Sequence, residues 1–291
     1  MSEKKRRKRY WLKVDQSRHP LLGAILDCPV INALDEFFGY FLAGLIDGDG
    51  YIHKRGYLYI YMHINDLRVA VALQARLGGH VYEVIGEESC VFVVRDRQNM
   101  DRVCKLICNK LKHHAKIKQY NTRLGPLCKD PQYRKTAEQP NFEILKTAWL
   151  SGFIFADGSY LIRTQTRTDG TEGLPRIELK VSQKNAYLLE EIKNAFGGSI
   201  SISVNDVNDA SKNVCQYSCS SYASQARVVA YGNEFPMPED SVKQTQFLLW
   251  KDACRVRANR EHLTPIGLDM ILGYKELMKA VSQDPDFFLD L

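Results

Sequence analysis

An internal repeat is the feature that most restricts what this chain can fold into. Residues 40–52 read Tyr-Phe-Leu-Ala-Gly-Leu-Ile-Asp-Gly-Asp-Gly-Tyr-Ile, and residues 149–160 read Trp-Leu-Ser-Gly-Phe-Ile-Phe-Ala-Asp-Gly-Ser-Tyr. A shift of 108 residues aligns Leu42 with Leu150, Gly44 with Gly152, Ile46 with Ile154, Asp49 with Asp157 and Gly50 with Gly158. A repeat of this kind indicates two copies of one structural unit in a single chain.

The segments that follow the two motifs also correspond. Residues 58–64 and 176–182 alternate apolar with polar or aromatic side chains, which is typical of strands with one buried face. Each is followed by an amphipathic helix, about 66–77 and 185–196, that ends at a pair of glycines. Two more short strands follow in each half, of which residues 199–204 alternate strictly. The predicted order is helix, two strands, helix, two strands and helix, used twice.

This order predicts an α+β protein made of two tandem αββαββα repeats. The segment from Gly125 to Pro140 is polar and contains proline, so we interpret it as the connection between the repeats. The predicted division is a basic N-terminal tail and lead-in (1–35), a first half (36–124), a linker (125–140), a second half (141–280) and a C-terminal tail (281–291).

Composition limits the class of protein. The 291 residues are 45% hydrophobic and 25% charged, which is ordinary for a soluble globular protein of about two domains. No stretch approaches the roughly 18 apolar residues that a membrane-spanning helix needs, so we expect no membrane partner. Residues 4–9 are all Lys or Arg, and without them the basic and acidic residues number 34 each. This run is interpreted as a solvated arm, a phosphate contact or a nuclear-type signal.

The eight cysteines do not point to a disulfide framework or to a metal site. They include no Cys-x-x-Cys pair, and Cys104 and Cys108 are spaced four residues apart in an apolar helical pattern. No apolar segment follows the basic run as in a secretory signal, and the N-terminus lacks the amphipathic pattern of a transit peptide. We therefore expect structural thiols in a reducing compartment and no zinc site.

The repeated motifs themselves resemble a known family. Residues 42–50, Leu-Ala-Gly-Leu-Ile-Asp-Gly-Asp-Gly, closely resemble the LAGLIDADG signature of homing endonucleases, and residues 150–158 resemble a second, diverged copy. Two copies in one chain resemble the monomeric, pseudo-symmetric members, and the resemblance covers about residues 36–280. It implies two antiparallel four-stranded sheets that form a DNA-binding saddle, with the two motif helices packed side by side at the centre.

The residues of the motifs are consistent with such packing. Glycine inside a helix costs about 1 kcal/mol relative to alanine, so the repeated glycines indicate close backbone contact. An aspartate at the C-terminal end of a helix is unfavourable because it opposes the helix dipole, and Asp49 and Asp157 would also repel each other. A divalent cation between them relieves both problems, and Mg²⁺ suits carboxylate, water and phosphate oxygens.

The resemblance implies a set of catalytic and metal-binding residues. Asp49 and Asp157 would be the catalytic carboxylates and metal ligands, helped by the backbone carbonyls of Gly48 and Ala156. Mg²⁺ would be the cofactor, with Mn²⁺ as a substitute and Ca²⁺ supporting binding without cleavage. The basic residues near the site would be Lys118 and Lys243, and a solvent-positioning glutamine would be Gln183, with Ile64 as its counterpart in the first half. Asp47, which is replaced by Phe155 in the second copy, is interpreted as a capping or packing residue.

The polar faces of the strands are the predicted readout surface, because the major groove of B-DNA admits a two-stranded β-ribbon. The candidates in the first half are His53, Arg55, Tyr59, Tyr61 and His63. Those in the second half are Arg163, Gln165, Arg167, Arg176, Glu178, Lys180, Ser201 and Ser203. Because the two halves carry different side chains, we expect a weakly palindromic site.

These observations favour a monomeric, site-specific, Mg²⁺-dependent double-strand DNA endonuclease that leaves a short 3′ overhang. The alternatives are a group I intron RNA maturase, a protein with both activities, or an inactive DNA-binding regulator. The last is disfavoured because both Asp49 and Asp157 are retained. The partners would be double-stranded DNA and its own intron RNA. By association with the family, the location would be a mitochondrion or chloroplast if the gene lies in an intron.

Overall fold

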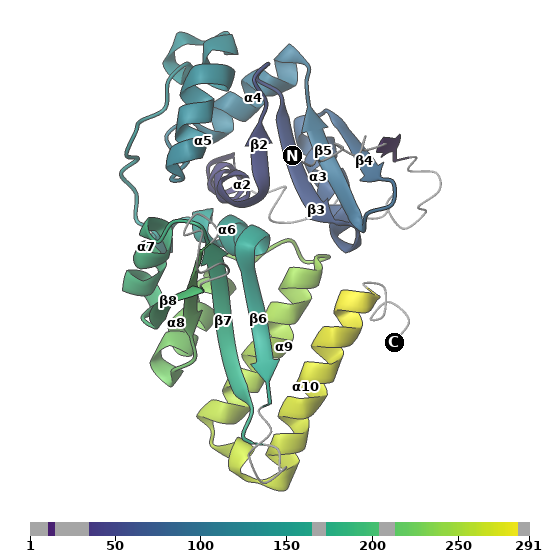
Figure 1. Cartoon of the computed structure of the whole chain (residues 1–291), viewed down its shortest axis with the longest axis vertical. Coiled ribbons are helices and arrows are strands. Elements are labelled where there is room, and N and C mark those ends of the chain that lie inside the picture. The colour runs from purple at the N-terminus through teal and green to yellow at the C-terminus, as the bar shows by residue number, and fades with distance from the viewer. Residues whose placement is uncertain (1–10, 15–34, 165–172, 204–212, 285–291) are drawn as a thin grey trace, which may run out of the picture.

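The computed structural model describes residues 11–14, 35–164, 173–203 and 213–284. The first half lies beside the second, and the helices α2 and α6 lie between them at the centre (Figure 1). The first half consists of β1 (Trp11–Lys13), α2 (Asp35–Asp49), β2 (Gly50–Ile52), β3 (Leu58–His63), α3 (Leu67–Leu77), β4 (His80–Val84), β5 (Ser89–Val94), α4 (Arg97–Ile107) and α5 (His114–Gln119). The second half consists of α6 (Trp149–Asp157), β6 (Gly158–Arg163), β7 (Arg176–Gln183), α7 (Tyr187–Phe196), β8 (Ser199–Ser203), β9 (Val214–Cys219), α8 (Tyr222–Glu234), α9 (Val242–Ala258) and α10 (Pro265–Gln283). The predicted αββαββα order is present in both halves.

Each half contains one antiparallel sheet. The second sheet has four strands in the order β6-β7-β9-β8, as predicted. The first has the corresponding four strands and a fifth, in the order β1-β4-β5-β3-β2. The added strand β1 pairs Trp11 with Val84, and it lies in the segment predicted to be the N-terminal tail and lead-in.

Side-chain alternation and terminal glycines shape these elements as expected. Along β3, Leu58 and Ile60 are fully buried while the intervening tyrosines are partly exposed. The C-cap residue of α3 is Gly78, with a φ of 76°, and that of α7 is Gly197, with a φ of 81°. Both values lie in the left-handed region that glycine adopts without strain.

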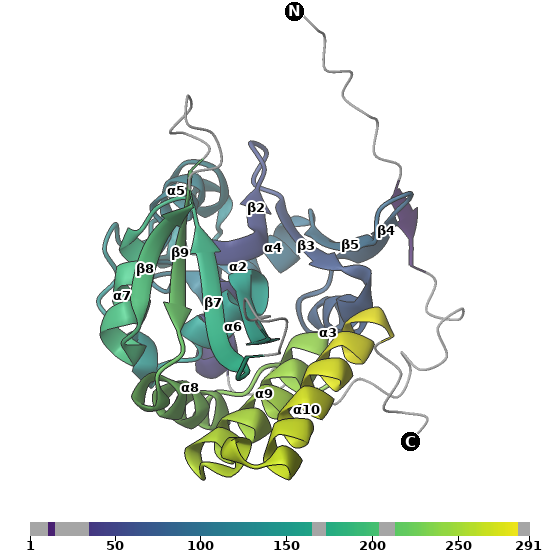
Figure 2. The ribbon, with the colours of Figure 1, turned by 60° about the horizontal axis from the view of Figure 1, so that its bottom comes forward.

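Helices cover the buried faces of the sheets. α3 packs on β4 and β5, and α9 packs on β6 and β7, so that the apolar face of each sheet is closed. The strands of both sheets lie above α3, α8, α9 and α10 in the second view (Figure 2). The opposite faces of the two sheets, from which the aromatic and polar side chains of the strands project, form the surface that we call the saddle. Within the described part of the chain, no helix is long and apolar enough to cross a membrane.

The segment 125–140 is packed against the first half. Cys128 is buried and donates through Sγ to Asp101 at 3.1 Å. Thr136 is also buried, and its hydroxyl accepts from the backbone of Asn109 at 2.7 Å. The connection is therefore held by specific contacts along part of its length, although its composition is that of a linker.

The central helices meet backbone to backbone. A methyl group on Gly44 of α2 would collide with the carbonyl oxygen of Trp149, and one on Gly152 of α6 would collide with that of Phe41. The two positions are equivalent in the repeat, and the contact is therefore reciprocal. This confirms the predicted close packing of the motif helices.

Gly44→Ala should lower the free energy of unfolding by about 1–3 kcal/mol or more, because the methyl group must displace a backbone carbonyl. The matched control is Gly273→Ala in α10, where a methyl group would meet no atom within 4 Å. That change should be neutral or stabilising by up to about 1 kcal/mol, because it replaces a helical glycine. Chemical denaturation measures both, and equal effects would contradict the packing argument.

Candidate active site and nucleic-acid interface

Two aspartates lie at matching ends of the central helices. α2 ends at Asp49 and α6 ends at Asp157, and each is followed at once by a glycine that begins a strand. A methyl group on Gly50 would lie 2.6 Å from the carbonyl oxygen of Ile46, and one on Gly158 would lie 2.6 Å from that of Ile154. Both glycines are therefore required for the sharp passage from helix to strand.

The two carboxyl groups are close enough to influence each other. A methyl group on Gly48 would meet the Cβ atom of Ala156 and would lie 2.8 Å from Oδ2 of Asp157, so this carboxyl group lies against the end of the opposite helix. Burial raises the pKa of Asp49 to about 6. Burial, followed by repulsion from Asp49, raises the pKa of Asp157 to about 7. The predicted meeting of the two acids is present in the structure.

Two half-buried lysines accompany the aspartates in matching positions. Lys116 Nζ donates to the carbonyl oxygen of Gly50, and Lys243 Nζ donates to that of Gly158 at 2.5 Å. Burial lowers the pKa of each lysine, and the nearby aspartates oppose this effect. Each half thus supplies one carboxylate and one ammonium group to the same centre.

The lysines are placed by the first turns of α5 and α9. His113 caps α5 and Ser241 caps α9, each accepting a backbone N–H through its side chain. A cation in the first turn of a helix opposes the helix dipole, so these positions are not favoured by the helices themselves. The aspartates and the carbonyl groups of Gly50 and Gly158 offset this unfavourable interaction of the lysines with the helix dipoles.

The predicted position of the first-half lysine requires correction. Lys118 is exposed and does not face the carboxyl pair. It lines a separate groove together with His114 and Thr122. Lys116 occupies the place that matches Lys243. Two residues along a helix correspond to a rotation of about 200°, so Lys116 and Lys118 point to different sides. Lys118 and Lys243 are each followed directly by a glutamine in the sequence, and this correspondence selected the wrong lysine of the first half.

Gln183 contacts the second aspartate. Its Nε2 donates to Oδ2 of Asp157 at 2.6 Å. The counterpart of Gln183 is set by strand register: Gly50 pairs with Ile60 in β3, and Gly158 pairs with Val181 in β7. Counting two residues further gives Met62, not Ile64 as predicted. The first half therefore has a thioether where the second has an amide.

The centre contains a third aspartate that the sequence analysis missed. Asp66, at the end of a short turn (Ile64–Asp66), is close to Lys243 and Asp49. Its Oδ1 accepts the backbone N–H of Val242 at 3.2 Å, and burial raises its pKa. Asp66 belongs to the first half and Val242 to the second, so this contact also joins the halves. The repeated motifs do not point to Asp66, because it lies outside both of them.

The centre fits a divalent cation. The two half-buried carboxyl groups have raised pKa values, and a cation of charge two between them would stabilise their ionised forms. Among the described residues, no group of three or more His, Cys, Asp or Glu side chains is arranged to hold a metal ion, so Asp66 is not counted as a third ligand. Two carboxylates suit Mg²⁺, which keeps several waters and completes its shell with phosphate oxygens. The roles of the Gly48 and Ala156 carbonyls as ligands stay predictions.

Asp47 is a packing residue, as predicted. It is 1% exposed, and its Oδ2 accepts from the indole Nε1 of Trp149 at 2.8 Å and from the backbone of Lys112 at 2.6 Å. Burial raises its pKa to about 7 despite these hydrogen bonds. Asp47 therefore ties α2 to the start of α6 and to the segment before α5.

The first sheet presents aromatic side chains on its saddle face. Tyr59 lies with its ring centroid 5.8 Å from that of Trp11, and the Arg95 guanidinium carbon is 5.8 Å from the Tyr59 ring. The candidates His53, Arg55, Tyr59, Tyr61 and His63 all fall at the saddle strands or their turns. His63 and His53 each accept a nearby backbone N–H. Trp11 and Arg95 were missed, because Trp11 belongs to the unpredicted strand β1.

The second sheet presents mainly cations. Arg163 and Arg176 are exposed and Lys180 is half-buried, whereas Glu178 lies beneath them at 2% exposure. Glu178 is therefore not presented to a ligand, which corrects its prediction as a base-reading residue. The candidates Ser201 and Ser203 are exposed on β8, and Gln165 and Arg167 lie outside the described residues.

Comparisons with known proteins agree with this architecture. Residues 150–254 match the family model described as LAGLIDADG endonuclease. The structure is similar to that of the meganuclease I-SmaMI bound to uncleaveable DNA, with a TM-score of 0.60 and 16% sequence identity. The match covers 81% of this chain and 97% of I-SmaMI. The second half of the chain therefore matches the LAGLIDADG model, and the chain as a whole shares the fold of solved LAGLIDADG endonucleases.

Relatives in sequence include intron-encoded proteins of fungi. The chain is 29% identical over 245 residues to the "Uncharacterized cox1 intron-2 37.2 kDa protein" of Schizosaccharomyces pombe, covering 82% of this chain and 72% of the relative. It is 25% identical over 171 residues to the "Intron-encoded RNA maturase bI4" of Saccharomyces cerevisiae, covering 56% of this chain and 25% of that protein. The chain thus spans only about a quarter of the maturase.

Asp47→Asn should make protein stability less dependent on pH. The pKa of folded Asp47 is about 7, above its ordinary value of 3.8, so the folded protein binds more protons than the unfolded chain between these values. Stability should therefore fall as pH rises through this window, and the slope should be shallower in Asp47→Asn. Denaturation at pH 5 and pH 8 measures it, with the exposed Asp240→Asn as control. An unchanged slope in Asp47→Asn would contradict the assignment.

Proposed function

We propose that the protein is a site-specific double-strand DNA endonuclease that hydrolyses one phosphodiester in each strand, depends on Mg²⁺ and leaves a short 3′ overhang. The observation that carries this proposal is the twofold set of Asp49 with Lys116 and Asp157 with Lys243, which meet at one centre. Two equivalent sets suit two equivalent bonds, one in each strand. The centre also lies at the ends of α2 and α6, where β2 and β6 begin.

The cation would supply a more acidic bound water and would offset the charge of the phosphate. Asp49 and Asp157 would hold it, and Mn²⁺ would substitute for Mg²⁺, whereas Ca²⁺ would support DNA binding without cleavage. Lys116 and Lys243 are fixed by the Gly50 and Gly158 carbonyls, so their charge is held in place for the phosphate. A preorganised cation of this kind stabilises charge that develops during hydrolysis.

The two halves would not be equally active. Gln183 donates to Asp157 and can orient a water molecule beside it, whereas Met62 in the matching position of the first half cannot. We therefore infer that the two strands are cut at different rates. The aromatic face of the first sheet and the cationic face of the second would read different half-sites, which supports a long, weakly palindromic target.

Asp49→Asn and Asp157→Asn should each reduce double-strand cleavage at least about 100-fold while DNA binding persists, because the amide keeps the size and removes the charge. Linearisation of a target plasmid with Mg²⁺ measures cleavage, and gel-shift titration with Ca²⁺ measures binding. The target would first be sought in the intronless DNA that flanks the gene. Purified variants that linearise the plasmid at the wild-type rate would refute the site.

Lys116→Met should slow cleavage by about 100-fold, by analogy with removal of one preorganised charge-stabilising group. Lys118→Met is the matched control, because Lys118 lies on the same short helix but is exposed and faces elsewhere. It should cleave within about twofold of the wild type. If Lys118→Met slowed cleavage more than Lys116→Met, the assignment of Lys118 from the sequence would be restored and the site described here would be contradicted.

The genomic setting is also a proposal. The relatives are intron-encoded proteins, and the first is named for a cox1 intron. These names support an intron-encoded gene and an organellar location, a mitochondrion in the first place. The complete site within one chain supports action as a monomer.

RNA maturation is a second candidate, favoured by the similarity to a maturase over 56% of this chain. A groove of about 840 Å³ between α8 and α9 is lined by Tyr222, Lys251, Arg255 and Arg260. α9 also packs against the apolar face of the second sheet, so the groove lies away from the saddle. A splicing assay of the host intron with and without the protein tests this activity, and unchanged splicing would exclude it.

A further inference from the structure

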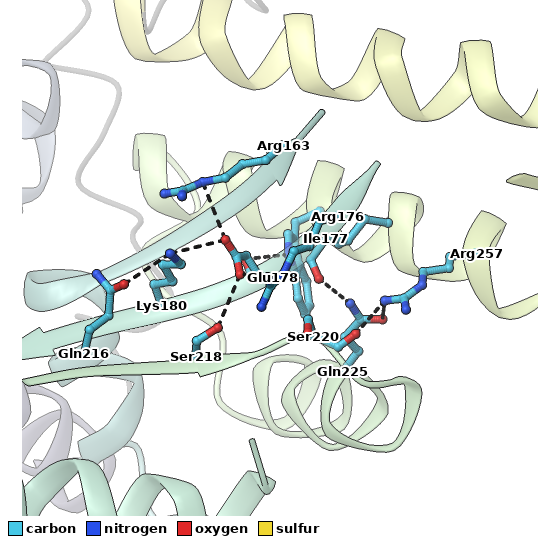
Figure 3. A network of polar contacts seen from close by, with 11 residues as sticks. Arg163, Arg176, Ile177, Glu178, Lys180, Gln216, Ser218, Ser220, Gln225 and Arg257 are labelled. Carbon is cyan, nitrogen blue, oxygen red and sulfur yellow. Dashed lines mark hydrogen bonds and ion pairs between the residues drawn. The ribbon is translucent and has the colours of Figure 1, made fainter. Parts of the chain in front are cut away.

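A buried carboxylate organises the cations on the second sheet. Glu178 is in the middle of β7, and its side chain points to the saddle face because its neighbours Ile177 and Leu179 are in the core. It is nevertheless only 2% exposed. The charges that cover it come from Arg163 of β6 and from Arg176 and Lys180 of β7 (Figure 3).

The contacts hold the three cations in one arrangement. Glu178 Oε1 lies 3.5 Å from Nε of Arg163 and 3.4 Å from Nζ of Lys180. Its Oε2 lies 3.1 Å from Nε of Arg176 and accepts from the hydroxyl of Ser218 at 3.3 Å. Lys180 is held a second time, because its Nζ donates to Oε1 of Gln216 at 3.1 Å. One anion therefore restrains three cations, and the group keeps a net positive charge.

The two arginines keep their recognition atoms available. Each approaches Glu178 most closely through Nε, and the side chains remain 52% and 53% exposed. The terminal Nη groups are the atoms that bind the O6 and N7 of guanine in pairs. An arginine held at Nε is oriented without losing this capacity, which lowers the cost of ordering a long side chain on binding.

We propose that Glu178 is a specificity-determining residue that acts through Arg163, Arg176 and Lys180, so that these cations read bases in one half-site instead of binding any phosphate. This inference rests on the proposed DNA-binding function. Arginine and lysine side chains that are not held in place by other residues readily bind backbone phosphates, and these contacts carry no sequence information. A buried anion beneath them opposes this use, because reaching outward for phosphates would leave its charge unpaired.

The test is selection of bound duplexes from a randomised DNA library by the wild type and by Glu178→Gln. Glutamine keeps the shape and the acceptor for Ser218 but removes the charge. In the variant, base preference should fall about tenfold at positions of the half-site under the second sheet. Preference in the other half-site should be unchanged and serves as an internal control. Affinity for unrelated duplex should be equal or higher, with a steeper dependence on salt.

Two further variants separate positioning from folding. Glu190→Gln removes a paired glutamate from the exposed surface of α7 and should leave selection unchanged. Arg176→Lys leaves Glu178 and the charge in place but removes the forked Nη pair, so it should lower preference in the same half-site while unspecific affinity persists. If Glu178→Gln fails to fold, Arg176→Lys carries the test alone.

The outcomes are distinguishable. If the wild type is selective and Glu178→Gln is equally selective, this inference is overturned and the proposed function stands. If Glu178→Gln does not fold, an equally selective Arg176→Lys has the same consequence. A wild type that selects no sequence would overturn the proposed function and the inference together. Loss of preference spread evenly over both half-sites would show a general loss of structure and would also contradict the role proposed for Glu178.

Discussion

The close approach of α2 and α6 is the constraint on which the rest of the structure depends. Gly44 and Gly152 remove the side chains that would separate the two backbones. Because the helices touch along their length, their C-terminal ends must also meet, and those ends carry Asp49 and Asp157. The same approach places β2 and β6, which follow the two helices directly, on either side of the contact. The centre and the saddle are thus consequences of one helix pair.

The meeting of the two acids leaves an electrostatic conflict that other residues reduce but do not remove. Burial and repulsion raise the pKa values of both aspartates, whereas Lys116 and Lys243 lower them. Each lysine is itself half-buried, and desolvation lowers its pKa. Such a concentration of strained charges is typical of a functional site rather than of a structural core. A cation and a phosphate would together complete the balance of charge.

Much of the fold was predictable, because the repeat, the strand alternation and the terminal glycines are local signals that the tertiary structure follows. The aspartate pair was predictable for the same reason. Lys116 was missed because letter alignment cannot tell which side of a short helix faces the centre. Asp66 and β1 were missed because neither has a repeated counterpart, and their places depend on contacts between distant segments. The burial of Glu178 depends on three cations brought together by strand pairing, which alternation alone does not reveal.

Anomalous diffraction from crystals of the protein with duplex DNA and Mn²⁺ tests the central claim most directly. We expect metal density between the carboxylates of Asp49 and Asp157, with a phosphate oxygen on the same ion. Metal bound elsewhere while these two side chains point apart would contradict the account, because the twofold centre would then have no chemical role.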